Sequence, residues 1–207
     1  MPMMSKREVI WRHLLVGARE GRRAWPSVTA LAEELGIAIS TTHRSLAHPL
    51  EIGALDLSPL GGLRVLDPVR LLALFAAHRH VQRDVVASVW SSMPAEEIEA
   101  EAVLAGATLG GFGAVVAHLG VNRIADYSRV LVYGRVDLSF LPKAPTGDGT
   151  EIWIAEPDSW LCSYGRVTPL VQAWADLFSM PGWQAARFVE ALDPREVTGV
   201  DQPVLLI

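Results

Sequence analysis

The fold is decided by residues 27–67, SVTALAEELGIAISTTHRSLAHPLEIGALDLSPLGGLRVLD. Ser27 has the side chain of a helix N-cap, and apolar residues from Val28 to Leu35 recur at the spacing of one helical face. Gly36 then permits the left-handed conformation in which many helices end. The pattern predicts a first short helix followed by a tight turn.

A second helix is predicted to follow, with Ser40 as its N-cap. Its first turn holds four short or polar side chains, Thr41, Thr42, His43 and Arg44. Such side chains suit base edges and phosphates better than a core. Pro49 predicts that this helix ends or kinks by His48, because proline cannot donate the next helical hydrogen bond.

A hairpin is predicted after the two helices. Residues 54–57 and 63–66 alternate like strands on either side of the turn-forming sequence SPLGG, residues 58–62. The order helix, turn, helix and hairpin is typical of a winged helix-turn-helix, which places one helix in the major groove of DNA. The alternative is a helical hairpin that only packs.

The charge of the chain changes sign along its length. Up to Arg83 there are eleven Lys and Arg against seven Asp and Glu, whereas the remainder holds seven basic and sixteen acidic residues. The first part therefore tolerates a polyanion that the second would repel. Arg22 and Arg23 are open to two interpretations, phosphate contacts or a solvated loop.

The composition is that of a folded protein of one or two small domains, with 207 residues of which half are hydrophobic. The single cysteine, Cys162, cannot form an internal disulfide, and the N-terminus lacks an apolar segment typical of secretion. The most apolar stretch, residues 103–121, is interrupted by five glycines and His118. We expect a cytoplasmic protein without a membrane partner.

The remaining elements predict an α+β protein. We expect helices over residues 6–19, from Asp67 toward Trp90, from residue 92, and over 111–119, 168–178 and 183–192, with strands at 129–133 and 151–155. The domains predicted are a winged helix-turn-helix at 1–67, a helical linker at 68–105 and a mixed α/β domain at 106–207. The linker could also serve dimerisation.

The C-terminal half resembles the AbiEi family, the antitoxins and regulators of type IV toxin–antitoxin systems. The stretches that carry the likeness are the alanine-containing segment Gly111–Gly120, LVYG at 131–134, TPLVQAWADLF at 168–178 and PGWQAARF at 181–188. They cover about half of the chain and consist mostly of packing residues. The resemblance implies a winged helix before an α/β domain, and a nucleotidyltransferase-like toxin as partner.

Catalytic and metal sites are not expected. Glu151, Glu156 and Asp158 could bind Mg²⁺ but lack a nearby lysine, and a solvated strand end explains them better. The sequence Gly111-Phe112-Gly113 has no third glycine to complete a dinucleotide loop. Cys162, His118 and Asp176 carry no nucleophile signature, and the histidine spacings do not suit a metal. We expect no enzyme activity, no cofactor and no metal.

The sequence therefore predicts a transcriptional regulator that binds double-stranded operator DNA as a homodimer. The residues predicted to contact DNA are Ser40, Thr41, Thr42, His43, Arg44 and Arg64. Arg44 is the best candidate for a guanine contact, and Arg64 lies on the predicted wing. Together with the resemblance, this favours an antitoxin that represses its own operon. The alternative is a C-terminal domain that senses a ligand or binds a protein partner without a toxin.

Overall fold

The computed structural model describes residues 5–60 and 62–200. The protein has an α+β fold with two separate sheets. The chain divides into two compact units: the first unit comprises the described residues of 5–78 together with 192–200, and the second unit comprises residues 79–191. Of the segment predicted as a helical linker, residues 68–78 thus belong to the first unit and residues 79–105 to the second.

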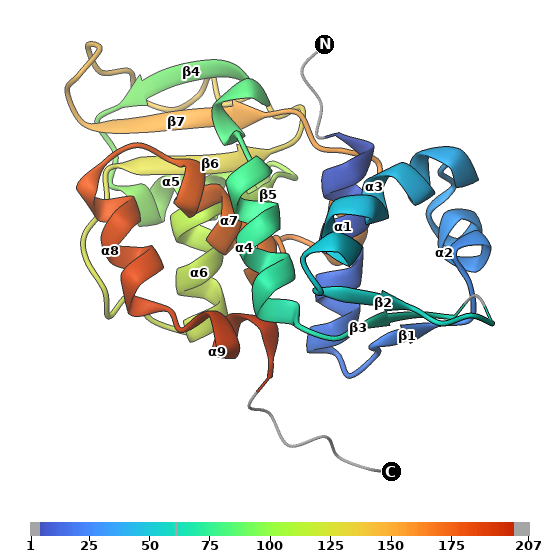
Figure 1. Cartoon of the computed structure of the whole chain (residues 1–207). Helices are drawn as coiled ribbons and strands as arrows, with labels where there is room; N and C mark the ends of the chain where they lie inside the picture. The colour runs from blue at the N-terminus through green and yellow to red at the C-terminus, as the bar shows by residue number, and fades with distance from the viewer. Residues whose placement is uncertain (1–4, 61, 201–207) are drawn as a thin grey trace. The chain divides into compact units, whose positions relative to one another are not determined.

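The first unit combines helices with a small antiparallel sheet (Figure 1). In chain order it contains α1 (Lys6–Arg19), β1 (Ala24–Trp25), α2 (Val28–Leu35), α3 (Ile39–Glu51), β2 (Leu55–Leu57), β3 (Leu63–Val65), α4 (Pro68–His78) and α9 (Pro194–Thr198). The strand order is β1-β3-β2, so β1 pairs with the second arm of the β2–β3 hairpin. Helix α1 packs against α3, α4 and α9 and lies at the centre of the unit.

The predicted helix caps of the first unit are largely confirmed. The Ser27 hydroxyl accepts a hydrogen bond from the Ala30 amide at 3.0 Å, and Gly36 ends α2 in the left-handed region with φ of 61°. Before α4, the Asp67 carboxylate accepts from the Arg70 amide at 3.0 Å. Each cap satisfies backbone groups that the first or last helical turn leaves without a partner.

The start of α3 was predicted wrongly. The helix begins at Ile39, and its N-cap is Ala38, which offers no side-chain hydrogen bond. Ser40 therefore lies inside the first turn and is not a cap. The backbone supplies the reason, since the Ala38 carbonyl accepts from the amides of Thr41 and Thr42, at 2.9 and 3.0 Å.

The predicted break at Pro49 does not occur, because α3 continues through this residue to Glu51. A proline at position 49 cannot donate to the Ser45 carbonyl four residues earlier. The indole Nε1–H of Trp11, on α1, donates to that carbonyl at 2.8 Å. A tertiary hydrogen bond thus replaces the missing helical one, and the buried Pro49 ring packs without ending the helix.

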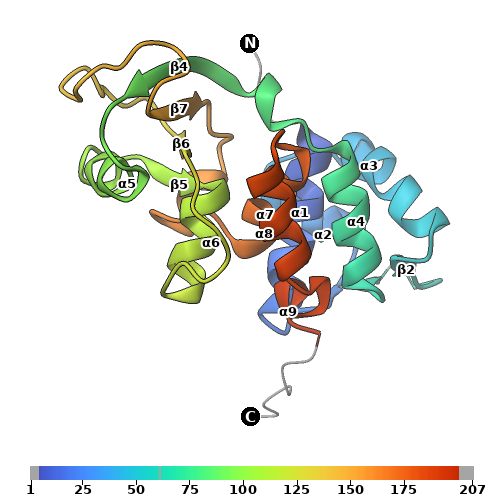
Figure 2. The ribbon, with the colours of Figure 1, turned by 90° about the vertical axis from the view of Figure 1, so that its left-hand side faces the viewer.

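The second unit contains a mixed four-stranded sheet with four helices (Figures 1 and 2). Its elements are a 3₁₀ helix (Val81–Arg83), β4 (Val85–Ser91), α5 (Ala95–Leu104), β5 (Thr108–Gly110), α6 (Gly111–Leu119), β6 (Arg129–Tyr133), β7 (Thr150–Ala155), a second 3₁₀ helix (Leu161–Tyr164), α7 (Leu170–Ser179) and α8 (Trp183–Ala191). The strand order is β4-β7-β6-β5. The central pair, β7 and β6, is parallel, and both edge strands run antiparallel to their neighbours.

The long helix predicted from Asp67 toward Trp90 is wrong beyond His78, where α4 ends. Residues Val85–Ser91 instead form β4, with Val89 opposite Ile152 of β7. This segment is rich in valine, which fits a strand at least as well as a helix. Its apolar character therefore did not distinguish the two, and pairing with β7 decided the outcome.

The two faces of the second sheet bury different side chains. On one face, Val130, Val132 and Ile152 join Ile98 and Ala102 of α5 in a single apolar cluster. The loop between β6 and β7 adds Leu138 and Leu141 to the same cluster. On the other face, Tyr133 reaches α7. The sheet is thus covered on both faces, although most of β4 remains exposed.

A buried polar network surrounds Arg79, the first residue of the second unit. The Arg79 guanidinium donates to Asp176 at 2.7 Å, to the Tyr133 hydroxyl at 2.8 Å and to Asp84. Tyr133 and Gln172 also donate to Asp176, each at 2.8 Å. A charge this deeply buried requires such partners. Gln172 and Asp176 of α7 thus have a structural role.

Candidate nucleic-acid interface

Helix α3 presents one continuous face to solvent. The exposed residues are Ile39, Ser40, His43, Arg44, Ala47, His48 and Glu51, and most of them recur every three or four positions. This spacing places them on one side of the helix, while the opposite side packs against α1 and α2. The exposed side chains of α3 are therefore accessible to a ligand.

Thr42 was predicted to contact DNA, and the structure contradicts this. Its side chain has no exposed surface, and its hydroxyl donates to the Ala38 carbonyl at 3.2 Å. Thr42 lies on the side of α3 that faces the core of the unit. Its polar side chain had suggested a surface position. Thr41, one position earlier, is half-buried and still reaches the edge of the exposed face.

Arg44 is the one arginine or lysine on this face of α3. Its guanidinium lies along its own helix, with Nε donating to the Ser40 carbonyl at 3.3 Å and Nη2 to the Thr41 hydroxyl at 3.5 Å. No carboxylate among the described residues pairs with it. The neighbouring His43 is also exposed and forms no hydrogen bond or ion pair within the described part of the chain. Both side chains can therefore turn toward an anion without breaking an ion pair.

Arg64 lies in the middle strand of the first sheet and is exposed. Its register partners are Ala24 on β1 and Asp56 on β2, so all three share the solvent face. Arg64 and Asp56 form no ion pair, but the carboxylate reduces the positive potential around the guanidinium. Sequence alternation predicted that Arg64 is exposed but not that Asp56 stands beside it.

The structure resolves the two interpretations of Arg22. Its guanidinium donates two hydrogen bonds of 2.6 Å to the carboxylate of Glu34 and lies 4.7 Å from the centre of the Trp25 ring. The hydrogen bonds from Arg22 lower the pKa of Glu34. His13 adds a third contact to Glu34 at 2.9 Å. Arg22 is therefore paired within the first unit, and a phosphate would have to compete with Glu34 for its guanidinium.

The charge difference between the units is smaller than the sequence indicated. The described residues of the first unit hold ten basic and nine acidic side chains, whereas the second unit holds eight basic and thirteen acidic ones. Arg79 and Arg83, which the sequence placed on the basic side, belong to the second unit. The first unit is thus nearly neutral, and Arg44 is the one arginine or lysine within α3.

Two residues of the candidate interface were missed by sequence reasoning. His48 is exposed on the same face as Arg44, but the expected break at Pro49 had placed it at the end of the helix. Leu60, in the turn of the β2–β3 hairpin, is 97% exposed. An apolar side chain in a loop carries no sequence signal that separates a surface position from a buried one.

The catalytic arrangements considered for the second unit do not assemble. Among the described residues, no group of three His, Cys, Asp or Glu side chains is arranged to hold a metal ion. Glu151 binds Arg129 at 2.8 Å, and Asp158 caps the turn before Leu161. Cys162 is exposed, whereas Asp176 is buried in the polar network of Arg79.

The glycine-rich start of α6 follows a strand, β5. A phosphate is nevertheless excluded there, because the Glu99 carboxylate is packed against Gly113 so closely that a Cβ would clash with it. The Tyr127 hydroxyl donates to Glu99 at 3.0 Å, and burial raises the pKa of Glu99 to about 7. Gly113 therefore makes room for a carboxylate, not for a dinucleotide.

The comparisons with known proteins add no relative. No protein-family model, no curated protein and no solved structure matches this chain. No helix in the described part of the chain combines the length and the apolar character needed to span a bilayer. Any function must therefore be argued from the geometry of the two units.

Proposed function

We propose that this protein is a transcriptional regulator that binds duplex DNA with the exposed face of α3. The observation that carries the proposal is the exposed face around Arg44, which has no acidic partner among the described residues. The order of elements in the first unit, with strand order β1-β3-β2, supports a winged helix-turn-helix. In this proposal α2 and α3 form the helix-turn-helix, and the β2–β3 hairpin is the wing.

Each part of the interface has a distinct role in the proposed complex. Arg44 releases its weak contacts with α3 and donates two hydrogen bonds to a guanine edge in the major groove. Ser40, Thr41 and His43 contact phosphates or neighbouring base edges, with His43 adding positive charge only when protonated. Arg64 contacts the backbone or the minor groove from the wing. Thr42 has no role, because it is buried.

Binding to operator DNA tests this proposal directly. Fluorescence anisotropy with DNA from upstream of the gene, measured across a salt series, is expected to show selective binding. The affinity should fall steeply as salt rises, because each neutralised phosphate releases counterions. Absence of selective binding at low salt would refute the proposal.

The resemblance to the AbiEi family extends the proposal to an antitoxin that represses its own operon. A homodimer would match a palindromic operator, and a nucleotidyltransferase-like toxin would be the partner. Within the stretch 168–178, which carries part of this resemblance, Gln172 and Asp176 are packing residues of the buried polar network. Co-expression with the product of the neighbouring gene tests this extension, since failure to rescue growth would leave only the regulator.

A ligand-sensing second unit is the competing candidate, and one observation favours it. A cavity of about 220 Å³ lies on the sheet face of the second unit, beside β4. Its lining side chains are mostly apolar, as is common in sites for small molecules. A protein partner bound through this unit would instead bury the surrounding surface and leave the cavity unoccupied.

A further inference from the structure

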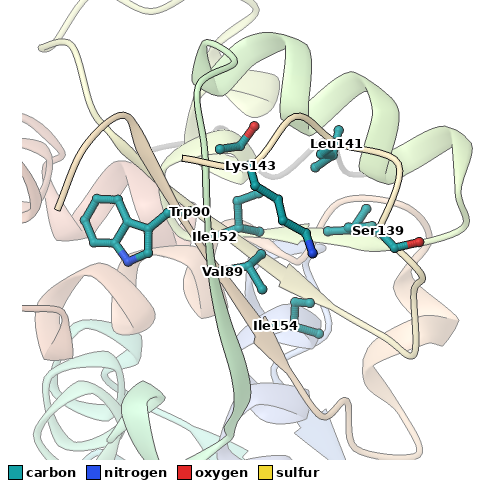
Figure 3. Close-up of a pocket in the computed structure, with 9 residues that line it drawn as sticks. Val89, Trp90, Ser139, Leu141, Lys143, Ile152 and Ile154 are labelled. Atoms are coloured by element: carbon teal, nitrogen blue, oxygen red, sulfur yellow. The ribbon is translucent and has the colours of Figure 1, made fainter. Parts of the chain in front are cut away.

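The cavity of the second unit has a floor of β-sheet and a roof of loop (Figure 3). Val89 of β4 with Ile152 and Ile154 of β7 forms the floor, since paired residues of adjacent strands point to the same face. Leu138 and Leu141, from the loop between β6 and β7, contribute the apolar part of the roof. Water inside such a lining finds few hydrogen-bond partners, which favours an apolar occupant.

The roof is held against β4 by a backbone hydrogen bond and by a hydrogen bond from a side-chain hydroxyl. The Ala144 amide donates to the Trp90 carbonyl at 3.0 Å, and the Ser91 hydroxyl donates to the Pro142 carbonyl at 2.7 Å. Lys143, between these two anchors, pairs with Ser91 in an isolated antiparallel bridge. The backbone of Lys143 is therefore fixed before any ligand arrives, which lowers the entropic cost of binding.

Among the described residues that line the cavity, Lys143 is the only charged one. Figure 3 shows its side chain extending among the residues that line the cavity. Lys143 forms no hydrogen bond or ion pair within the described residues, and no carboxylate lines the cavity. The Ser91 hydroxyl is already used, since it donates to the Pro142 carbonyl at 2.7 Å, and the Ser139 backbone amide donates to Asp137 at 2.9 Å. One positive charge therefore remains without a counterion beside an apolar surface.

Lysine, the residue at position 143, is rare in this chain. Of eighteen basic residues, sixteen are arginine and only Lys6 and Lys143 are lysine. A compact ammonium on a flexible stem fits beside a small ligand where a planar guanidinium would fill more of the space.

From this arrangement we propose that the cavity is a binding site for a small monocarboxylate with an apolar body. The carboxylate pairs with the Lys143 ammonium, and the apolar body rests on Val89, Ile152 and Ile154. A cavity of about 150 Å³ in another protein accommodates benzene. The volume of about 220 Å³ therefore holds one ring, or a chain of similar size, together with a carboxylate. The proposal concerns the second unit alone and does not depend on DNA binding.

The probes that fit this description are phenylacetate and hexanoate, with phenylacetamide and hexanamide as uncharged analogues. Binding is followed by the shifts of Ile and Val methyl signals in NMR titrations of the full chain. Both acids are expected to produce saturable shifts at Val89, Ile152 and Ile154, and each amide should bind more weakly than its acid. In a second arm, reductive ¹³C-methylation labels Lys6 and Lys143, and phenylacetate should move only the signal of Lys143.

Two pairs of variants separate the charge from the cavity. Lys143→Met removes the ammonium but keeps an apolar stem, and it should weaken acid binding about fivefold, as expected for a solvent-accessible ion pair, without changing amide binding. Lys6→Met is its matched control and should have no effect. Val89→Trp fills the cavity and should abolish the binding of acids and amides alike. Val86→Trp places the same side chain on β4 outside the lining and should leave binding intact.

Three results would overturn the proposal. The first is the absence of saturable methyl shifts with either acid up to about 20 mM, a ligand concentration at which millimolar affinity is visible. The second is equal binding of acid and amide together with an unaffected Lys143→Met variant, which would rule out a carboxylate ligand. The third is unchanged binding in Val89→Trp, which would place the site elsewhere.

Discussion

At the scale of single residues, the proposed function depends on side chains whose partners are weak. Arg44 is held only by its own helix, whereas Arg22 is held by two short hydrogen bonds to Glu34. The sequence predicted a guanine contact for Arg44 and left a phosphate contact open for Arg22. The difference between them arises because Glu34, twelve positions away along the chain, is brought to Arg22 by the fold.

Arg44→Ala is expected to weaken operator binding by on the order of 1–3 kcal/mol if the guanidinium forms a bidentate contact with guanine. The loss should be largest for the operator and small for unrelated DNA, because a base contact carries the sequence preference. Anisotropy titrations with both DNAs measure this. Arg7→Ala, an exposed arginine on α1, is the matched control, and an unchanged affinity in Arg44→Ala would remove Arg44 from the interface.

Glu99 predicts a pH dependence for the stability of the second unit. Burial raises its folded pKa to about 7 from an ordinary 4.5, so the folded state binds the proton more tightly than the unfolded chain. The contribution to stability is therefore full below pH 4.5 and is lost as the pH rises through about 7. The shift corresponds to a change of up to about 3 kcal/mol in the free energy of unfolding.

Glu99→Gln should therefore raise the free energy of unfolding at pH 8 and flatten its pH profile between pH 5 and pH 8, a window of roughly three units that includes the raised pKa. Urea denaturation at several pH values measures both effects. Glu97→Gln, at an exposed position of the same helix, is the control and should keep the pH profile of the unmodified protein. A profile that stays steep in Glu99→Gln would assign the pH dependence to another group.

At the scale of elements, α3 shows how a tertiary contact overrides a local rule. Pro49 removes one helical hydrogen bond, and Trp11 of α1 replaces the donor at the Ser45 carbonyl. The candidate DNA-binding helix therefore keeps its last turn, including the exposed His48. Strand β4 shows the same principle, since pairing with β7 decides the conformation of a valine-rich segment that local pattern leaves ambiguous.

Trp11→Phe tests the contribution of this contact to the first unit. Loss of the indole N–H leaves the buried Ser45 carbonyl without its donor, which should cost about 1–3 kcal/mol beyond the loss of volume. Trp25→Phe is a matched control, because the Trp25 indole N–H is buried without a hydrogen-bond partner among the described residues. Chemical denaturation of the two variants gives the comparison. Equal destabilisation would mean that the hydrogen bond to Ser45 adds nothing.

At the scale of the whole molecule, the first unit is discontinuous in sequence. It is completed by α9, which packs against α1 and α4 and comes from the far end of the chain. Arg19 donates to the Val197 carbonyl at 2.8 Å and also to that of Glu196, and both Val197 and Thr198 are fully buried. No local pattern in residues 1–78 indicates that a partner for α1 lies more than a hundred residues later.

Removal of the chain after Ala191 is therefore expected to destabilise the first unit. Loss of the apolar surface buried by α9 should cost at least about 2 kcal/mol. Amide hydrogen exchange in α1 and α4 should accelerate roughly 30-fold, which corresponds to that free energy. Glu196→Ala, which alters an exposed side chain but keeps the backbone contacts, is the control. Unchanged protection of α1 would show that residues 5–78 suffice for the unit.

The sequence by itself determined most elements of this protein, because caps, glycine stops and apolar spacing act over a few residues. Ser27 and Gly36 define α2, and the apolar run before Tyr133 defines β6, without any distant contact. Only the tertiary structure decided which polar side chains remain available to bind a ligand. Thr42 is buried, Arg22 is paired, and Lys143 faces an apolar cavity, because each outcome depends on groups that are close in space but distant in sequence.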